Sequence, residues 1–207
     1  MGFTGNIARD RSILGSLLER LELPASLASP LLAHARAVER GAERLGLISP
    51  ADAQSVVPRH SADSLLFAVL RRPRAGERWV DVGSGAGFPG FVLAVCFPEI
   101  NFTLSEPLQR RAGFLAATAA ELGLQNVDIT TSRADSLPTA FDVAVARAFA
   151  RPGAALAALL HLVRPGGEAI VAAGAEASDV PGANVVRLTD IDNVDSPGVF
   201  SMMTREG

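Results

Sequence analysis

The feature that most constrains this fold is a glycine-rich turn between a strand-like run and a helix-like run. The strand-like run is RWVDV (residues 78–82), and the turn GSGAGFPG (residues 83–90) follows it without a break. Glycines let the backbone approach a ligand closely, and the helix after the turn offers free N–H groups and a positive dipole end. This order predicts a strand–turn–helix unit that binds a ligand at the carboxyl end of the strand.

From this turn onward, short strand-like runs alternate with helix-like runs. Strands are predicted at 78–82, 101–105, 127–131, 141–145 and 168–172, and helices at 89–97, 108–122 and 153–162. Two weaker strand candidates, 184–188 and 199–204, suit an antiparallel hairpin at the sheet edge. The pattern predicts a Rossmann-like α/β fold with an open, doubly wound sheet of seven strands, mostly parallel, the last strand antiparallel.

The first 72 residues carry a different, helical pattern. Apolar residues recur at helical spacing over 13–21 and again over 31–45, which predicts three or four helices before about residue 73. Ser49, followed by Pro50 and Asp52, has the pattern of a helix N-cap. We therefore expect a helical N-terminal region (1–72) and a ligand-binding domain (73–207), with a linker at 71–76.

Charge is unevenly distributed along the chain. The net charge is −3 and all 19 basic residues are arginine, yet residues 1–78 hold 11 arginines against 8 acids. An acidic chain is a poor candidate for sequence-independent binding of nucleic acid. The basic N-terminal region still leaves room for a local phosphate-facing surface, for which RRPR (residues 71–74) is a candidate.

Two observations bear on the compartment. The one cysteine, Cys96, lies in the apolar run FVLAVCF (residues 91–97) and is expected to be buried rather than paired in a disulfide. No apolar stretch reaches 18 residues, and the N-terminus lacks the features of a signal peptide. The sequence therefore predicts a cytoplasmic protein without membrane contact.

Two cofactors suit the glycine turn. A dinucleotide requires Gly-x-Gly-x-x-Gly, which residues 85–90 provide, but Pro89 stands where the helix begins. For S-adenosylmethionine, Asp81 precedes the glycines and reaches the amino group of the methionine moiety directly or through water. Glu106, 21 residues after Gly85, can accept hydrogen bonds from both ribose hydroxyls of an adenosine cofactor. We favour S-adenosylmethionine over a dinucleotide, and over a turn that binds no ligand.

Several segments of the chain resemble the GidB (RsmG) family. They are RHSADSL (59–65), DVGSGAGFPG (81–90), EPLQRR (106–111), SRAD (132–135) and RAFA (147–150), and the similarity covers about residues 49–175. Members of that family are class I methyltransferases that use S-adenosylmethionine to methylate N7 of a guanine in bacterial small-subunit ribosomal RNA, releasing S-adenosylhomocysteine. The resemblance implies that this chain has the same activity and takes part in rRNA processing. It also implies that the partner is the RNA or the ribosomal subunit.

The resemblance also implies where the cofactor lies. Gly83 and Phe88 would flank the methionine end, and Glu106 would hold the ribose. Ala134 and Asp135 would border the adenine, although Asp135 also reads as a solvated loop acid. Arg147 would lie at the mouth shared by cofactor and substrate. The expected cofactor-binding residues are Asp81, Gly83, Ser84, Gly85, Gly87, Phe88, Glu106, Ala134, Asp135 and Arg147.

The implied chemistry needs orientation more than proton transfer. Guanine N7 carries an in-plane lone pair and no proton, so no general base is expected. Arginine suits a clamp for base and phosphates because of its planar fork. The expected substrate-binding residues are Arg147, Arg133, Arg59 and His60. For Arg133 and Arg59 an ion pair with a nearby acid is an equally good interpretation. For His60 we favour a hydrogen-bonded link between the helical region and the sheet. The histidines lack metal-ligand spacing, and no metal is predicted.

The chain departs from the family on the expected substrate side. Family members usually carry a Lys-Gly pair after the fifth strand, where this chain has Ala173 and Gly174, and often a serine where it has Ala146. Losing a cation removes a phosphate contact. The alternative is therefore a methyltransferase of a small molecule, derived from the ribosomal enzyme. A module that binds S-adenosylmethionine without transferring methyl is a third reading.

Overall fold

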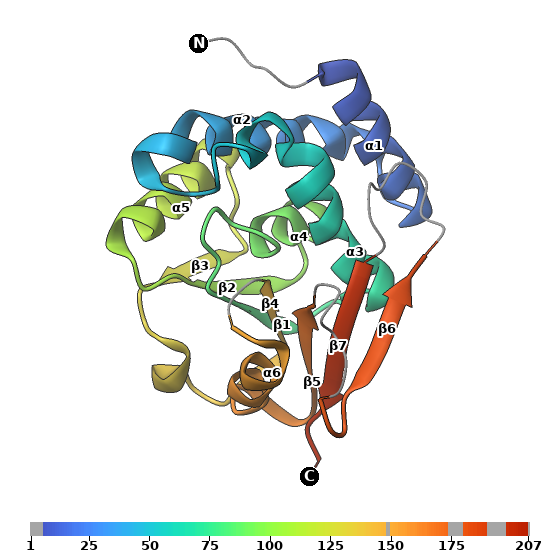
Figure 1. Ribbon diagram of the computed structural model, residues 1–207, viewed down its shortest axis with the longest axis vertical. Coiled ribbons are helices and arrows are strands. Elements are labelled where there is room, and N and C mark those ends of the chain that lie inside the picture. Colours follow the sequence, from blue (N-terminus) through green and yellow to red (C-terminus); the bar gives the residue numbers. More distant parts are fainter. Residues whose placement is uncertain (1–5, 148–149, 174–179, 190–197, 207) are drawn as a thin grey trace.

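The computed structural model describes residues 6–147, 150–173, 180–189 and 198–206. These residues form a seven-stranded sheet in the order β3-β2-β1-β4-β5-β7-β6 (Figure 1). The strands are β1 (Arg78–Val82), β2 (Asn101–Ser105), β3 (Val127–Thr130), β4 (Phe141–Arg147), β5 (Val163–Ala172), β6 (Asn184–Leu188) and β7 (Gly198–Thr204). Strands β1 to β5 are parallel, and β7 runs antiparallel to both β5 and β6. The predicted fold class is confirmed, including the antiparallel last strand.

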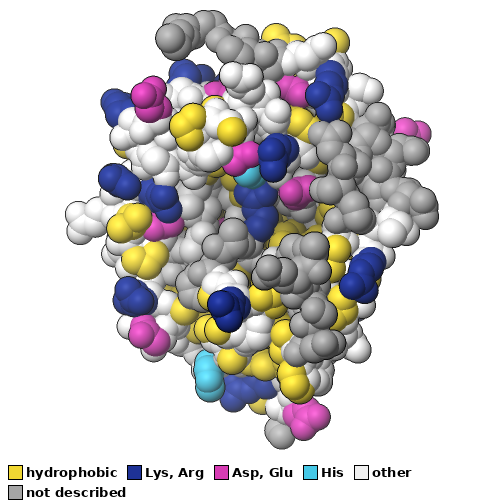
Figure 2. All heavy atoms as spheres, in the orientation of Figure 1, with side chains coloured by type: hydrophobic (Ala, Val, Ile, Leu, Met, Phe, Trp, Pro, Cys, Tyr) yellow, Lys and Arg dark blue, Asp and Glu magenta, His cyan; other side chains and the backbone are white. Residues whose placement is uncertain are grey.

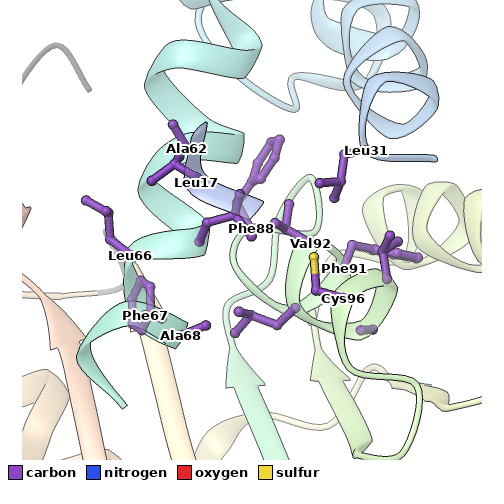
Figure 3. Packing of buried hydrophobic residues seen from close by; sticks show 14 of the residues in the cluster. Leu17, Leu31, Ala62, Leu66, Phe67, Ala68, Phe88, Phe91, Val92 and Cys96 are labelled. Atoms are coloured by element: carbon purple, nitrogen blue, oxygen red, sulfur yellow. The ribbon is translucent and has the colours of Figure 1, made fainter. Parts of the chain in front are cut away.

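The helices cover the two faces of this sheet unequally. They are α1 (Ile7–Arg20), α2 (Ala28–Leu45), α3 (Ala62–Leu70), α4 (Gly90–Cys96), α5 (Gln109–Leu122) and α6 (Pro152–Leu160). The larger hydrophobic core joins α1 to α5 with one face, and the smaller core joins α6 with the other. Figure 3 shows Leu17, Leu31, Ala62 and Val92, from four different helices, in the larger core. Since the N-terminal helices share this core with the sheet, the division at residue 72 stays a prediction.

Strand β1 is the buried centre of both cores. Successive side chains of a strand point to opposite faces. Trp79 packs in the larger core, whereas Val80 and Val82 pack in the smaller one. The same alternation places Asp81 on the face of α4, where its carboxyl group is fully buried. The chain runs from β1 to β2 and β3 on one side and then crosses over from β3 to β4 on the other side of β1. The carboxyl end of β1 is therefore the switch point where such sheets bind ligands.

The structure extends or alters three predicted elements. Strand β4 continues to Arg147, and β5 begins at Val163, five residues earlier than predicted. Its first half contains Pro and Gly, but Gly166 N and Arg205 N donate to the carbonyl oxygens of Arg205 and Gly167, both at 2.9 Å. The predicted α-helix N-cap at Ser49 is wrong: the segment is a 3-10 turn, Asp52–Gln54, whose N-cap is Ala51, and Ser49 Oγ accepts from Asp52 N at 3.2 Å.

The arginine run at 71–74 lies far from the glycine turn. Arg71 donates to Glu77 at 2.6 Å and to Glu168 at 2.7 Å, and Arg72 donates to the carbonyl oxygen of Leu21 at 2.7 Å. Glu77 immediately precedes β1, so these contacts lie at the amino end of the sheet. Arg71 and Arg72 thus fix the predicted linker in place. A phosphate-facing role for this run stays a prediction.

Cys96 is confirmed as a buried side chain. It is 3% exposed in α4, and burial raises the pKa of its thiol to about 12. Within the described ranges, no helix combines the length and the apolar character needed to span a membrane.

Candidate functional site

The turn between β1 and α4 depends on glycine at defined positions. Gly83, Gly85 and Gly87 have φ angles of 73°, 57° and 93°, in the left-handed region that glycine tolerates best. A Cβ atom on Gly87 would lie 2.4 Å from Cδ2 of Phe91, so a larger residue cannot fit there. At Gly85 the nearest atom to such a Cβ is a backbone oxygen at 3.8 Å. The turn is thus packed against the protein at Gly87 and open at Gly85.

The first N–H groups of α4 are already bonded. Gly90 N donates to Oδ2 of Asp81, and Phe91 N donates to the carbonyl oxygen of Gly87, both at 2.9 Å. The expectation of free N–H groups at the start of this helix is therefore wrong. A dinucleotide places its pyrophosphate on such groups. Their occupation argues against a dinucleotide at this turn.

Asp81 offers an unpartnered carboxylate oxygen beside the turn. The residue is 0% exposed, and its Oδ1 has no hydrogen-bond partner among the described residues. Burial raises the pKa of Asp81 to about 6, although the hydrogen bond from Gly90 N opposes the shift. A cationic amino group next to Oδ1 would stabilise the carboxylate and satisfy this oxygen. The geometry therefore suits the amino group of a methionine moiety.

Glu106 is fixed by the turn with acceptor capacity to spare. The residue follows β2 and is 4% exposed. Its Oε2 accepts from Gly85 N at 3.0 Å, and its Oε1 accepts from Leu108 N at 2.9 Å. Each carboxylate oxygen can accept a second hydrogen bond. Two acceptors therefore remain for the hydroxyls of a ribose.

Two pockets meet at Gly83. One has a volume of about 270 Å³ and contains Arg133, Ala134 and Asp135 in its lining. The other has a volume of about 250 Å³ and is lined in part by Ser84, Gly85, Phe88, His60 and Arg147. The predicted adenine-side residues thus line the first pocket, together with Arg133. The second pocket brings together the residues predicted at the methionine end and two of those predicted for the substrate, His60 and Arg147. We refer to the two pockets as the adenine-side pocket and the acceptor-side pocket. Four predicted residues are not among the lining of either pocket: Asp81, Gly87, Glu106 and Arg59.

Arg147 is held rigidly in the acceptor-side pocket, with its side chain 19% exposed. It donates to Nδ1 of His60 at 2.8 Å and to the carbonyl oxygen of Arg59 at 3.2 Å. Its guanidinium lies 5.2 Å from the centre of the Phe88 ring and 3.8 Å from the Asp63 carboxylate. Arginine only donates, so Nδ1 of His60 is the acceptor. His60, whose pKa burial lowers to about 4, therefore joins the helical region to β4 as a neutral ring.

The other two predicted substrate arginines do not line the acceptor-side pocket. Arg133 lines the adenine-side pocket together with Ala134 and Asp135. The Arg59 side chain is 61% exposed, and its Nε lies 3.2 Å from Oδ1 of Asp52. Arg59 forms the ion pair that its alternative reading anticipated, and a role for either residue in substrate binding stays a prediction.

Sequence reasoning missed His34, a buried residue of α2. Its Nε2 lies 2.8 Å from the carbonyl oxygen of Ala86, and its ring stacks with Phe91 at a centroid distance of 5.3 Å. Burial lowers the pKa of His34 to about 4, and a carbonyl oxygen only accepts, so neutral His34 donates from Nε2. The sequence signal that could have indicated a buried histidine is its position within the apolar stripe of α2. His34 thus anchors the glycine turn to the helical region.

Removing this anchor should loosen the turn. We expect His34→Ala to weaken binding of S-adenosylmethionine about tenfold, because the buried carbonyl of Ala86 loses its partner, a cost of about 1–3 kcal/mol. Isothermal titration calorimetry measures the affinity. The matched control is His161→Ala, which removes an exposed histidine after α6. Equal affinities for the two variants would contradict the anchoring role.

Some expected residues fall outside the described ranges. These are Ala148 and Phe149 of the family segment and Gly174 after β5. Ala173, which stands where the family usually has lysine, is 7% exposed. Among the residues that the structure describes, no group of three or more His, Cys, Asp or Glu side chains could hold a metal ion.

The sequence matches a protein-family model and several curated relatives. The family model described as GidB, rRNA small subunit methyltransferase G, matches residues 28–183. A protein of Leifsonia xyli subsp. xyli named ribosomal RNA small subunit methyltransferase G is 41% identical over 152 residues, which cover 72% of this chain and 71% of that protein. A protein of the same name from Mycobacterium leprae is 40% identical over 144 residues, covering 67% of this chain and 57% of that protein.

Solved structures with this fold are more distant in sequence. A mutant of MtNAS in complex with S-adenosylmethionine superimposes with a TM-score of 0.61 at 18% identity, covering 92% of this chain and 81% of that one. A SAM dependent methyltransferase from Aquifex aeolicus gives a TM-score of 0.54 at 18% identity, covering 76% and 95%. These similarities show a shared fold.

Proposed function

The chain belongs to the GidB family, and from this premise we propose that it is an S-adenosylmethionine-dependent methyltransferase that methylates N7 of a guanine in small-subunit ribosomal RNA. Loss of the methyl group converts the cofactor into S-adenosylhomocysteine. The observation that carries the proposal is the unpartnered, buried Oδ1 of Asp81, two residues before Gly83, the residue at which the two pockets meet. We further propose that the protein works in the cytoplasm, on the RNA or the ribosomal subunit.

The residues present fit S-adenosylmethionine in all three of its parts. Asp81 would hold the amino group, Glu106 the ribose, and Asp135 in the adenine-side pocket the adenine amino group. When bound, S-adenosylmethionine supplies an electrophilic methyl group on a positively charged sulfur. The space beside Gly85 is open to the cofactor, because the nearest atom to a Cβ placed on Gly85 is a backbone oxygen at 3.8 Å.

The protein's own contribution to the reaction is orientation. Guanine N7 has a free lone pair and no proton to remove, so the acceptor-side pocket has only to align the base. Arg147 suits this task because its guanidinium is already positioned by His60, Arg59 and Phe88. A preorganised donor pays little for reorganisation when it meets a ligand.

The character of the acceptor-side pocket supports RNA as the acceptor. Arg147 and Arg111 both line it, and Arg59 lies next to it with an exposed side chain. A pocket for a small apolar molecule would be expected to be enclosed and mostly apolar. The observation that favours a small-molecule acceptor is the buried Ala173, which cannot replace a lysine as a phosphate contact.

Transfer of labelled methyl from S-adenosylmethionine to small ribosomal subunits that lack the modification tests the proposal. Cleavage chemistry selective for 7-methylguanine would then locate the product. We expect incorporation at one guanine. A protein that binds S-adenosylmethionine in the same preparation but labels no RNA would contradict the ribosomal function and favour the small-molecule acceptor.

A further inference from the structure

The acceptor-side pocket has hydrogen-bonding groups of opposite character on its walls. Arg147, at the end of β4, contributes donors, and Asp52, in the 3-10 turn of the helical region, contributes acceptors. The glycine turn forms a third wall through Gly83 and Gly85. Figure 2 shows arginine and acidic side chains gathered around a histidine near the middle of the drawn face. The pocket therefore offers both donors and acceptors to a base.

Asp52 is held in place while retaining acceptor capacity. Its Oδ2 accepts from the Ser49 hydroxyl at 2.7 Å, and its Oδ1 lies 3.2 Å from Nε of Arg59. Its side chain is 23% exposed, so a ligand in the pocket can reach it. The hydrogen bond from Ser49, aided by Arg59, keeps the pKa of Asp52 below its usual value. At neutral pH Asp52 therefore acts only as an acceptor, with one further hydrogen bond available to each oxygen.

Guanine complements such a carboxylate. Its N1–H and N2 amino group lie side by side and both donate, whereas adenine has an acceptor at N1. Proteins read unstacked RNA bases through these Watson–Crick edges. The opposite side of guanine carries N7, which must face the methyl donor near Gly83. A base held with N7 toward the glycine turn thus presents its two donors away from that turn.

We propose that Asp52 selects guanine by accepting hydrogen bonds from N1–H and the N2 amino group of the target base. This inference rests on the proposed function and names the specificity-determining residue of its acceptor site. It differs from the simpler role of Asp52 as the ion-pair partner of Arg59. If Asp52 only pairs with Arg59, its removal should weaken the binding of all bases equally. If Asp52 selects guanine, its removal should weaken the binding of guanine most.

Binding of nucleoside monophosphates to the protein saturated with S-adenosylhomocysteine tests this inference by calorimetry. The bound product keeps the probes out of the adenine-side pocket. Wild-type protein should bind guanosine monophosphate about tenfold more tightly than inosine monophosphate, which lacks only the N2 amino group, and adenosine monophosphate more weakly still. Asp52→Ala should reduce the preference for guanosine over inosine to within about twofold.

Two further variants separate selection from structure. Arg59→Gln removes the ion-pair partner of Asp52 and should keep the ratio of guanosine to inosine affinity. Asp128→Ala removes an exposed acid of β3 and should change neither the affinities nor the ratio. Equal binding of guanosine and inosine monophosphates by wild-type protein, or an unchanged preference in Asp52→Ala, would overturn the inference.

Methyl transfer to small subunits distinguishes this inference from the proposed function. Active wild-type protein whose nucleotide preference does not depend on Asp52 overturns the inference and leaves the function standing. Wild-type protein that transfers no methyl to the subunits, but prefers guanosine through Asp52, supports the inference and overturns the ribosomal acceptor.

Discussion

Gly85→Arg should abolish binding of S-adenosylmethionine. The φ of Gly85 is 57°, and a Cβ built there meets no atom closer than 3.8 Å, so the new side chain would project into open space. That space belongs to the acceptor-side pocket, which Gly85 lines, and Glu106 accepts a hydrogen bond from the same residue. We expect at least a 100-fold loss of affinity, about 2.7 kcal/mol or more, measured by calorimetry.

The matched control for this variant is Gly123→Arg. Gly123 follows α5 with a φ of 67°, and a Cβ there would have nothing within 4 Å. The control therefore carries a similar left-handed backbone strain, about 1–2 kcal/mol, at a residue that lines neither of the two pockets. Gly123→Arg should keep its affinity for S-adenosylmethionine. If folded Gly85→Arg bound S-adenosylmethionine with unchanged affinity, the proposal that the cofactor binds at this turn would be contradicted.

Local patterns in the sequence predict most of the fold. β1 and β2 begin and end where the sequence predicts: β1 lies between Glu77 and Gly83, and β2 runs from the polar Asn101 to the residue before Glu106. The early part of β5 escapes prediction because Pro165 and Gly166 normally interrupt a strand. It pairs with Arg205, about 40 residues away along the chain, and no local pattern contains that information.

In the candidate site, too, the residues set by local sequence patterns are predictable, whereas those brought in by distant parts of the chain are not. The glycine turn and Glu106 are predictable because one strand–turn–helix unit and the next strand contain them. His34 and Asp52 reach the site only through the packing of the helical region, and His34 meets Ala86 across 52 residues of chain. The prediction of free N–H groups at the start of α4 fails for a local reason: Asp81, in the strand that precedes the turn, accepts a hydrogen bond from Gly90 N.

Arg147→Ala should reduce kcat/KM for methyl transfer to small subunits by about 100-fold or more, the range seen when one preorganised donor is removed from an active site. The expected loss of unfolding free energy is smaller, about 1–3 kcal/mol, because the bonds to His60 and to the Arg59 carbonyl disappear. Arg147→Lys should restore little activity, since lysine keeps the charge but lacks the planar fork. Steady-state kinetics and denaturant unfolding measure the two effects.

Arg71→Ala is the opposite case and serves as the control. Arg71 is also buried and ion-paired, with a side chain 11% exposed between Glu77 and Glu168, but it lies at the amino end of the sheet. Removing it leaves two carboxylates without their counter-ion, which should lower the free energy of unfolding by about 3–5 kcal/mol. The folded fraction should keep its kcat/KM. If Arg147→Ala instead lost activity only in proportion to its stability, as an unfolding variant would, Arg147 would have a structural role and the acceptor-side pocket would lose its principal donor.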